Sequence, residues 1–88
     1  MGRLEGKTVV VTGGGRGLGR AFAEHILREG GRVAIAEIDG EMGEKTAQEL
    51  RAAGNDVFAH QTDISSAASL ESLAAAVRER WGGLDGLV

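Results

Sequence analysis

The 88-residue sequence contains no cysteine, no tyrosine and no proline, and aromatic residues make up only 3% of it. Without cysteine there is no disulfide framework, no thiolate metal site and no thiol nucleophile. The two histidines, His25 and His60, are far apart and lack the spacing of metal ligands. We therefore expect no metal site. We place His25 on a helix and His60 in a strand, and we assign chemistry to neither.

Long apolar runs and clusters of one charge are also missing. No apolar segment approaches the length that crosses a membrane. The ten Lys and Arg residues are scattered and the net charge is −3, so no basic patch favours nucleic acid or an anionic membrane. We expect a cytoplasmic protein without nucleic-acid or membrane partners. A chain of this length forms at most one small domain of marginal stability.

Glycine is the residue in excess, with fifteen copies that fall mostly between apolar segments. Short β-branched runs predict strands, and segments of helical periodicity alternate with them. The strands are expected at 7–12, 32–38, 57–64 and 84–88, and the helices at 17–29, 39–53 and 66–81. This βαβαβαβ order predicts an α/β fold with a Rossmann-like, doubly wound parallel sheet. Because the fourth strand would leave an apolar edge unpaired, we expect residues 1–88 to be the amino-terminal part of a longer single-domain protein.

The helical patterns also predict caps and inner faces. Asp39 is expected to cap the second helix, and Ser65 or Ser66 the third. Inner positions of the first helix are Leu18, Ala21, Phe22 and Ile26; those of the third are Leu70, Leu73, Ala74, Val77 and Trp81.

The loop "TGGGRGLG" follows the first predicted strand and leads into a helix. Amides at the start of a helix have no intrahelical partner and lie at the positive end of the helix dipole. A pyrophosphate can bind there if glycines let it approach the backbone. Neither G-x-G-x-x-G nor the phosphate-loop motif fits, whereas Thr-Gly-x-x-x-Gly-x-Gly fits Thr12, Gly13, Gly17 and Gly19. The alternative is that these glycines serve only to make a turn.

The loop resembles the opening of the short-chain dehydrogenase/reductase (SDR) family. Three further segments, "VAIAEID", "TDIS" and "GGLDGLV", resemble that family in the same order, and together they cover essentially the whole chain. The resemblance implies the NAD(P)-binding part of an oxidoreductase that transfers a hydride between the cofactor and a small-molecule alcohol or ketone. It also implies that the full-length form is a homo-oligomer.

The resemblance assigns a role to several residues. Arg16, Leu18 (through its backbone amide) and the glycines Gly13, Gly17 and Gly19 would line the phosphates. Glu37 would accept hydrogen bonds from the ribose hydroxyls, which favours NAD over NADP, and Asp63 with the amide of Ile64 would contact the adenine. Two simpler roles remain open, because Glu37 could be a solvated loop carboxylate and Asp63 could serve only a turn. Asp39 is a rival for the ribose.

No catalytic residue is assigned. In the family the proton comes from a Tyr-x-x-x-Lys motif assisted by Ser and Asn, and this sequence has no tyrosine. We therefore expect the 88-residue chain alone to be inactive. A non-catalytic dinucleotide-binding module is one alternative. An S-adenosylmethionine-dependent methyltransferase is another, since Gly15, Gly17 and Gly19 formally give G-x-G-x-G, although Thr12 stands where such enzymes usually have an acidic residue.

Overall fold

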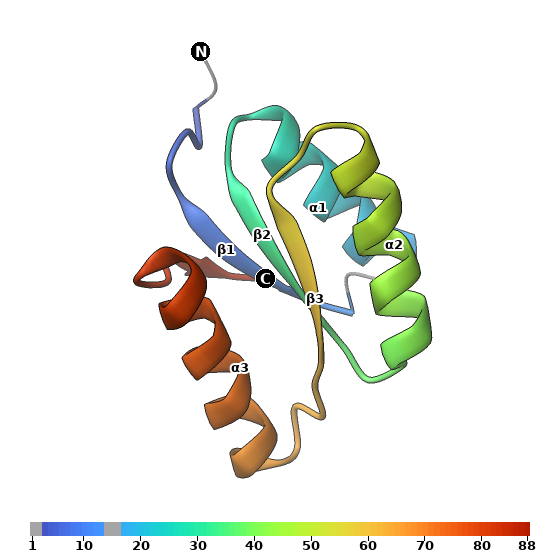
Figure 1. Cartoon of the computed structure of the whole chain (residues 1–88), viewed down its shortest axis with the longest axis vertical. Helices are drawn as coiled ribbons and strands as arrows, with labels where there is room; N and C mark the ends of the chain where they lie inside the picture. The colour runs from blue at the N-terminus through green and yellow to red at the C-terminus, as the bar shows by residue number, and fades with distance from the viewer. Residues whose placement is uncertain (1–2, 14–16) are drawn as a thin grey trace.

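The computed structural model describes residues 3–13 and 17–88. Strands and helices alternate as predicted, and the strands form one parallel sheet in the order β3-β2-β1-β4 (Figure 1). The elements are β1 (Thr8–Thr12), α1 (Gly17–Arg28), β2 (Arg32–Glu37), α2 (Gly40–Ala52), β3 (Val57–Gln61), α3 (Ala67–Trp81) and β4 (Gly86–Leu87). The Rossmann-like, doubly wound architecture is confirmed.

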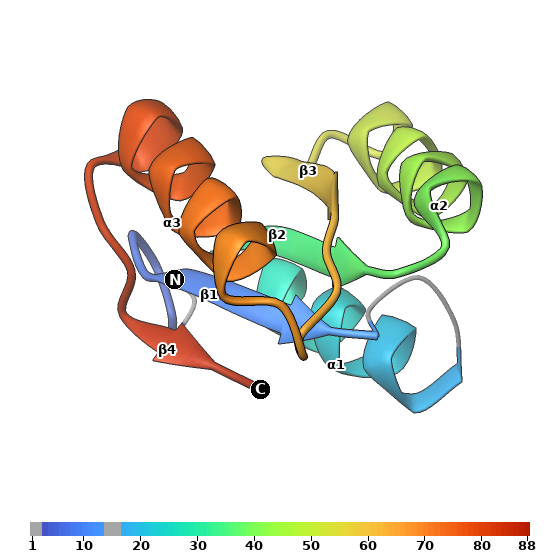
Figure 2. The same ribbon diagram turned by 90° about the horizontal axis from the view of Figure 1, so that it is seen from below.

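Helices cover both faces of the sheet, and α3 lies apart from α1 and α2 (Figure 2). One apolar cluster joins α1 and α2 to the sheet through Val9, Val11, Ala23, Ile26, Leu27, Val33, Ile35, Ala47, Leu50 and Val57. A smaller cluster joins α3 to the other face through Val10, Ala34, Ala36, Leu73 and Val77. Because β1 and β2 are buried on both faces, they are continuous apolar runs rather than alternating ones.

Local capping chemistry sets the helix ends. The Asp39 carboxylate accepts a hydrogen bond from the Met42 amide at 3.1 Å, so α2 begins where predicted. Ser66 caps α3 by accepting from the Ser69 amide at 3.2 Å. At its other end α3 stops at Gly82, whose φ of +85° lies in the left-handed region that glycine tolerates best.

The predicted inner faces of α1 and α3 are confirmed at Ile26, Leu73 and Val77 and wrong at other positions. On α1, Leu18, Ala21 and Phe22 are exposed, while Ala23, Ile26 and Leu27 are buried. On α3, Leu73 and Val77 are buried, Trp81 is half-buried, and Leu70 and Ala74 are exposed. Each helix carries more than one apolar stripe, and only its docking angle on the sheet decides which stripe is buried. The strand expected at 57–64 ends at Gln61, and the Thr62 amide makes the last hydrogen bond to β2, to the Glu37 carbonyl.

Candidate functional site

The carboxyl ends of β1, β2 and β3 meet around a hollow of about 340 Å³. Parallel strands bring their carboxyl ends to one edge of the sheet, which is where ligands bind in doubly wound folds. Among the predicted site residues, Gly13, Glu37, Asp63 and Ile64 come together here. The lining consists of Thr12, Gly13, Ala36, Glu37, Ile38, Thr62, Asp63 and Ile64.

Gly13 leaves β1 in a conformation that favours glycine. Its φ is +64°, and its amide donates to the Ala36 carbonyl at 2.8 Å, which is the last hydrogen bond from this end of β1 to β2. Gly17, the first residue of α1, also has a positive φ, of +55°. A residue with a side chain would be strained at either position. The predicted phosphate contact of Arg16 lies outside the described residues.

The start of α1 adjoins this edge of the sheet. The first turn of the helix, which includes Leu18 and Gly19, contains no acidic side chain that would neutralise the positive end of the helix dipole. Leu18 is 73% exposed, so its side chain contributes little to the core. The positive end of the helix favours an anion, and both basic residues (Arg20, Lys45) and acidic residues (Asp39, Glu41, Glu49) line a hollow at Gly17.

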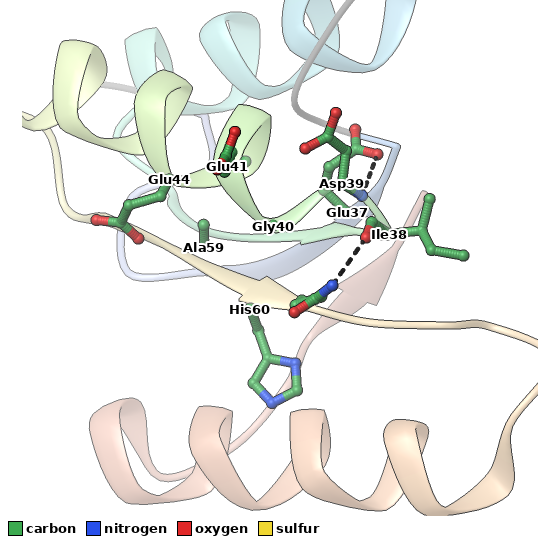
Figure 3. Close-up of a pocket in the computed structure, with 10 residues that line it drawn as sticks. Glu37, Ile38, Asp39, Gly40, Glu41, Glu44, Ala59 and His60 are labelled. Atoms are coloured by element: carbon green, nitrogen blue, oxygen red, sulfur yellow. Dashed lines mark hydrogen bonds between the residues drawn. The ribbon is translucent and has the colours of Figure 1, made fainter.

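Glu37 is the last residue of β2 and is only 4% exposed. Its carboxylate accepts a hydrogen bond from the Asp39 amide at 3.2 Å (Figure 3). A Cβ atom at Gly43 of α2 would lie 3.1 Å from the Glu37 Cβ, so the absent side chain leaves room for Glu37 beside the helix. The alternative of a solvated loop carboxylate is therefore wrong. Asp39, the rival, is exposed and caps α2.

Asp63 lies in the turn between β3 and α3. One carboxylate oxygen accepts from the Ser65 hydroxyl at 2.6 Å and from the Ser65 amide at 2.9 Å. These hydrogen bonds stabilise the ionised form and hold the pKa of the Asp63 carboxyl below its ordinary value. The turn role considered for Asp63 is thus present, and its contact with a ligand stays a prediction. Ile64 is 64% exposed beside it.

Thr62 is a site residue that the sequence reasoning missed. It is 2% exposed, it lines the hollow, and its hydroxyl donates to the His60 carbonyl at 3.0 Å. The sequence did carry a signal. Strands of a parallel sheet are normally apolar, yet His60 lies in such a strand and Thr62 directly follows it.

A larger hollow of about 650 Å³ lies on the α2 side of Glu37 (Figure 3). Four carboxylates line it, those of Glu37, Asp39, Glu41 and Glu44. Their combined negative charge disfavours a phosphate-bearing ligand. The start of α1 lines a third hollow, of about 560 Å³, in which Gly17 lies with Arg20 and Lys45 as well as with acidic side chains of α2. Among residues 3–13 and 17–88, no three His, Cys, Asp or Glu side chains are arranged to hold a metal ion. No helix in those ranges is long and apolar enough to cross a membrane.

Comparisons with known proteins bear on the family and the fold of the chain. The family model described as "short chain dehydrogenase" matches residues 7–88. The chain is 46% identical over 86 residues to a sorbitol dehydrogenase of Cereibacter sphaeroides, covering 98% of this chain and 32% of that enzyme. It is 42% identical over 82 residues to the 2,5-dichloro-2,5-cyclohexadiene-1,4-diol dehydrogenase LinX of Sphingobium indicum, covering 93% of this chain and 33% of that enzyme.

Among solved structures, the chain resembles a short-chain dehydrogenase/reductase from Burkholderia phymatum that was crystallised with NAD. The TM-score is 0.92 at 39% identity, over 99% of this chain and 31% of that one. The chain thus spans about a third of the length of the curated relatives that it matches.

Proposed function

The chain belongs to the short-chain dehydrogenase family, and on that premise we propose that it binds the dinucleotide of an NAD-dependent oxidoreductase. In this proposal residues 1–88 form the cofactor-binding segment of a larger single-domain enzyme. That enzyme transfers a hydride between the nicotinamide and a small-molecule alcohol or ketone, and it acts as a homo-oligomer.

The observation that carries the proposal is the hollow at the ends of β1, β2 and β3. It brings a positive-φ glycine (Gly13), a buried carboxylate (Glu37) and an exposed turn (Asp63 and Ile64) to one edge of the sheet. These features match the three parts of an adenine dinucleotide. The pyrophosphate takes the helix start, the ribose hydroxyls donate to Glu37, and the adenine lies against Asp63 and Ile64.

When bound, the dinucleotide supplies the hydride chemistry, and the residues of this chain bind and orient it. Gly13, Gly17 and the amides of Leu18 and Gly19 receive the phosphates, together with Arg16. The chain contains no tyrosine, so the proposal assigns it no proton-transfer residue. The family match gives no support to a methyltransferase.

We propose NAD rather than NADP as the cofactor. NADP carries a phosphate on the adenosine ribose, at the place where Glu37 would accept a hydroxyl hydrogen bond from NAD. A phosphate about 4 Å from the carboxylate is repelled by about 1 kcal/mol per charge pair in water and by about 4 kcal/mol at an effective dielectric constant of about 20. The guanidinium of Arg16 opposes this preference, because it can pair with the extra phosphate.

Calorimetric titration of the 88-residue chain with NAD, and separately with S-adenosylmethionine, tests the proposal. We expect saturable binding of NAD that adenosine monophosphate displaces, because both ligands fill the adenosine part of the hollow. Saturable binding of S-adenosylmethionine, or no binding of NAD, contradicts the proposal.

A further inference from the structure

His60 links β3 to α3 beside the candidate site. Its ring points away from α2 and toward α3 (Figure 3). Nδ1 lies 2.8 Å from the Thr62 hydroxyl, and Nε2 lies 3.1 Å from the Ser72 hydroxyl on α3. Both ring nitrogens are therefore within hydrogen-bonding distance of a partner, although the residue sits in a strand where an apolar side chain would normally pack.

Counting hydrogen atoms fixes the direction of these bonds. The Thr62 hydroxyl has one hydrogen and two contacts, the His60 carbonyl at 3.0 Å and the His60 Nδ1 at 2.8 Å. A carbonyl can only accept, so the hydroxyl hydrogen goes to the carbonyl. The hydroxyl oxygen then accepts from Nδ1–H. In the neutral ring Nε2 is left without hydrogen and accepts from the Ser72 hydroxyl.

This arrangement holds the end of β3 in place between β2 and α3. The Thr62 amide donates to the Glu37 carbonyl at 3.0 Å, and the Asp63 amide donates to the Ser69 hydroxyl at 2.9 Å. Thr62 and Asp63 both line the hollow, whereas His60 does not. The most direct connection from His60 to a ligand in that hollow is therefore its hydrogen bond with Thr62.

We propose that His60 is a positioning residue for dinucleotide binding. Its Nδ1–H orients Thr62, and Thr62 sets the place of Asp63 and Ile64 on the adenine side of the hollow. The inference rests on the proposed function, and it gives a role to a histidine to which sequence reasoning assigned no chemistry.

Three variants of the 88-residue chain test the role through the dissociation constant for NAD. His60→Leu removes both ring nitrogens at similar bulk, and we expect binding about fivefold weaker, the equivalent of one net hydrogen bond. His60→Asn keeps an N–H group near the place of Nδ1, so we expect it to restore most of the affinity. His25→Leu, on the exposed surface of α1, is the matched control and should bind as the wild type does.

Nitrogen-15 NMR of the wild type tests the direction of the hydrogen bond between His60 and Thr62, while the affinity for NAD tests the positioning role. We expect the neutral His60 ring to carry its hydrogen on Nδ1, the less common tautomer in solution. If His60→Leu fails to fold, Thr62→Val removes the same bond from the other side at nearly the same shape. Thr62→Ser, which keeps the hydroxyl, should bind NAD more tightly than Thr62→Val.

Several results would overturn the inference. The first is a hydrogen on Nε2 in the neutral ring. The second is an unchanged affinity for NAD in His60→Leu or, if that variant does not fold, in Thr62→Val. The third is an affinity for NAD in His60→Asn that is as weak as in His60→Leu. A wild-type chain that binds no NAD refutes the proposed function, and the inference with it. A wild-type chain that binds NAD while His60→Leu binds equally well refutes the inference alone.

Discussion

Glu37 is a carboxylate that is almost fully removed from water. Burying a charge is costly unless hydrogen bonds offset the loss of hydration, and the Asp39 amide supplies one such bond. A ribose that donates its hydroxyls to the carboxylate adds further hydrogen bonds of the same kind. A phosphate cannot do this, because it brings a second negative charge.

The first prediction concerns Glu37→Ser. We expect the wild-type chain to bind NAD at least about tenfold more tightly than NADP, near 1.4 kcal/mol, and the substitution to shrink that ratio. The measurement is the pair of dissociation constants for each variant. Glu41→Ser, which removes an exposed carboxylate from the start of α2, is the control and should keep the wild-type ratio. Equal affinities in the wild type would assign cofactor selection to Arg16 instead.

The second prediction concerns the titration of Asp63. Because its folded-state pKa is lowered by the hydrogen bonds from Ser65, the ionised carboxylate stabilises the turn at neutral pH. That contribution is lost as the pH falls through the folded-state pKa. We expect Ser65→Ala to raise the pKa of Asp63 toward the ordinary aspartate value, as followed by carbon-13 NMR of the carboxyl group. An Asp63 that titrates identically in both chains would contradict this assignment.

Single residues also mark where prediction from sequence stops. The cap at Asp39 could be predicted because it depends on local geometry, whereas the phosphate contact expected of Gly13 stays a prediction. The burial of Glu37 could not be predicted, because it depends on α2 passing close to β2 at Gly43. The bond from His60 to Ser72 joins residues on two elements, and no local pattern shows it.

At the scale of elements, α2 contains a glycine where a helix would gain from a side chain. Glycine within a helix costs about 0.5–1 kcal/mol relative to alanine. At Gly43 a Cβ atom would lie 3.1 Å from the Glu37 Cβ and 3.5 Å from the Ala59 Cβ. These atoms are attached directly to backbone, so no rotamer change relieves the contact, and α2 would have to move away from the sheet.

The third prediction is that Gly43→Ala lowers the free energy of unfolding by about 1 kcal/mol, the lower end of overpacking costs, instead of raising it. Chemical denaturation measures the change. Gln48→Ala and Gln48→Gly, on the exposed face of the same helix, calibrate the ordinary cost of glycine in α2. If Gly43→Ala raises the free energy of unfolding by as much as Gln48→Ala exceeds Gln48→Gly, then α2 can shift freely and the prediction is contradicted.

Element boundaries were predictable where capping residues define them, as at Asp39 for α2 and at Ser66 and Gly82 for α3. Which face of a helix is buried was less predictable. Phe22 looks like a core residue in the pattern of α1, yet it is 43% exposed. The helix periodicity gives the spacing of apolar residues, while the rotation of the helix on the sheet is a tertiary property.

For the whole molecule, the β4 side of the sheet exposes several apolar side chains, among them Leu84, Leu87 and Val88. In the described sheet β4 pairs with β1 alone, and Leu87 is 67% exposed. A hollow of about 430 Å³ between α3 and this edge is lined by apolar residues that include Val10, Leu73, Val77, Leu84 and Leu87. An unpaired strand edge with exposed apolar side chains favours association with another strand or chain.

The fourth prediction is that the 88-residue chain associates with itself as its concentration rises, as measured by sedimentation velocity. Leu87→Lys should reduce the association, because a charged side chain at a strand edge opposes pairing. Phe22→Lys, an exposed apolar position on α1, is the control and should associate as the wild type does. A monomer at every concentration, with a sharp cooperative melt, would contradict this view of the β4 edge.

The central claim is that the ends of β1, β2 and β3, with the start of α1, bind a dinucleotide. Nitrogen-15 NMR of the 88-residue chain during titration with NAD tests it most directly, because each backbone amide reports its own surroundings. We expect the largest shifts at the amides of Gly13, Leu18, Gly19, Ile38, Asp63 and Ile64. Shifts confined to the acidic hollow around Glu41 and Glu44, or no shifts at saturating NAD, would contradict the claim.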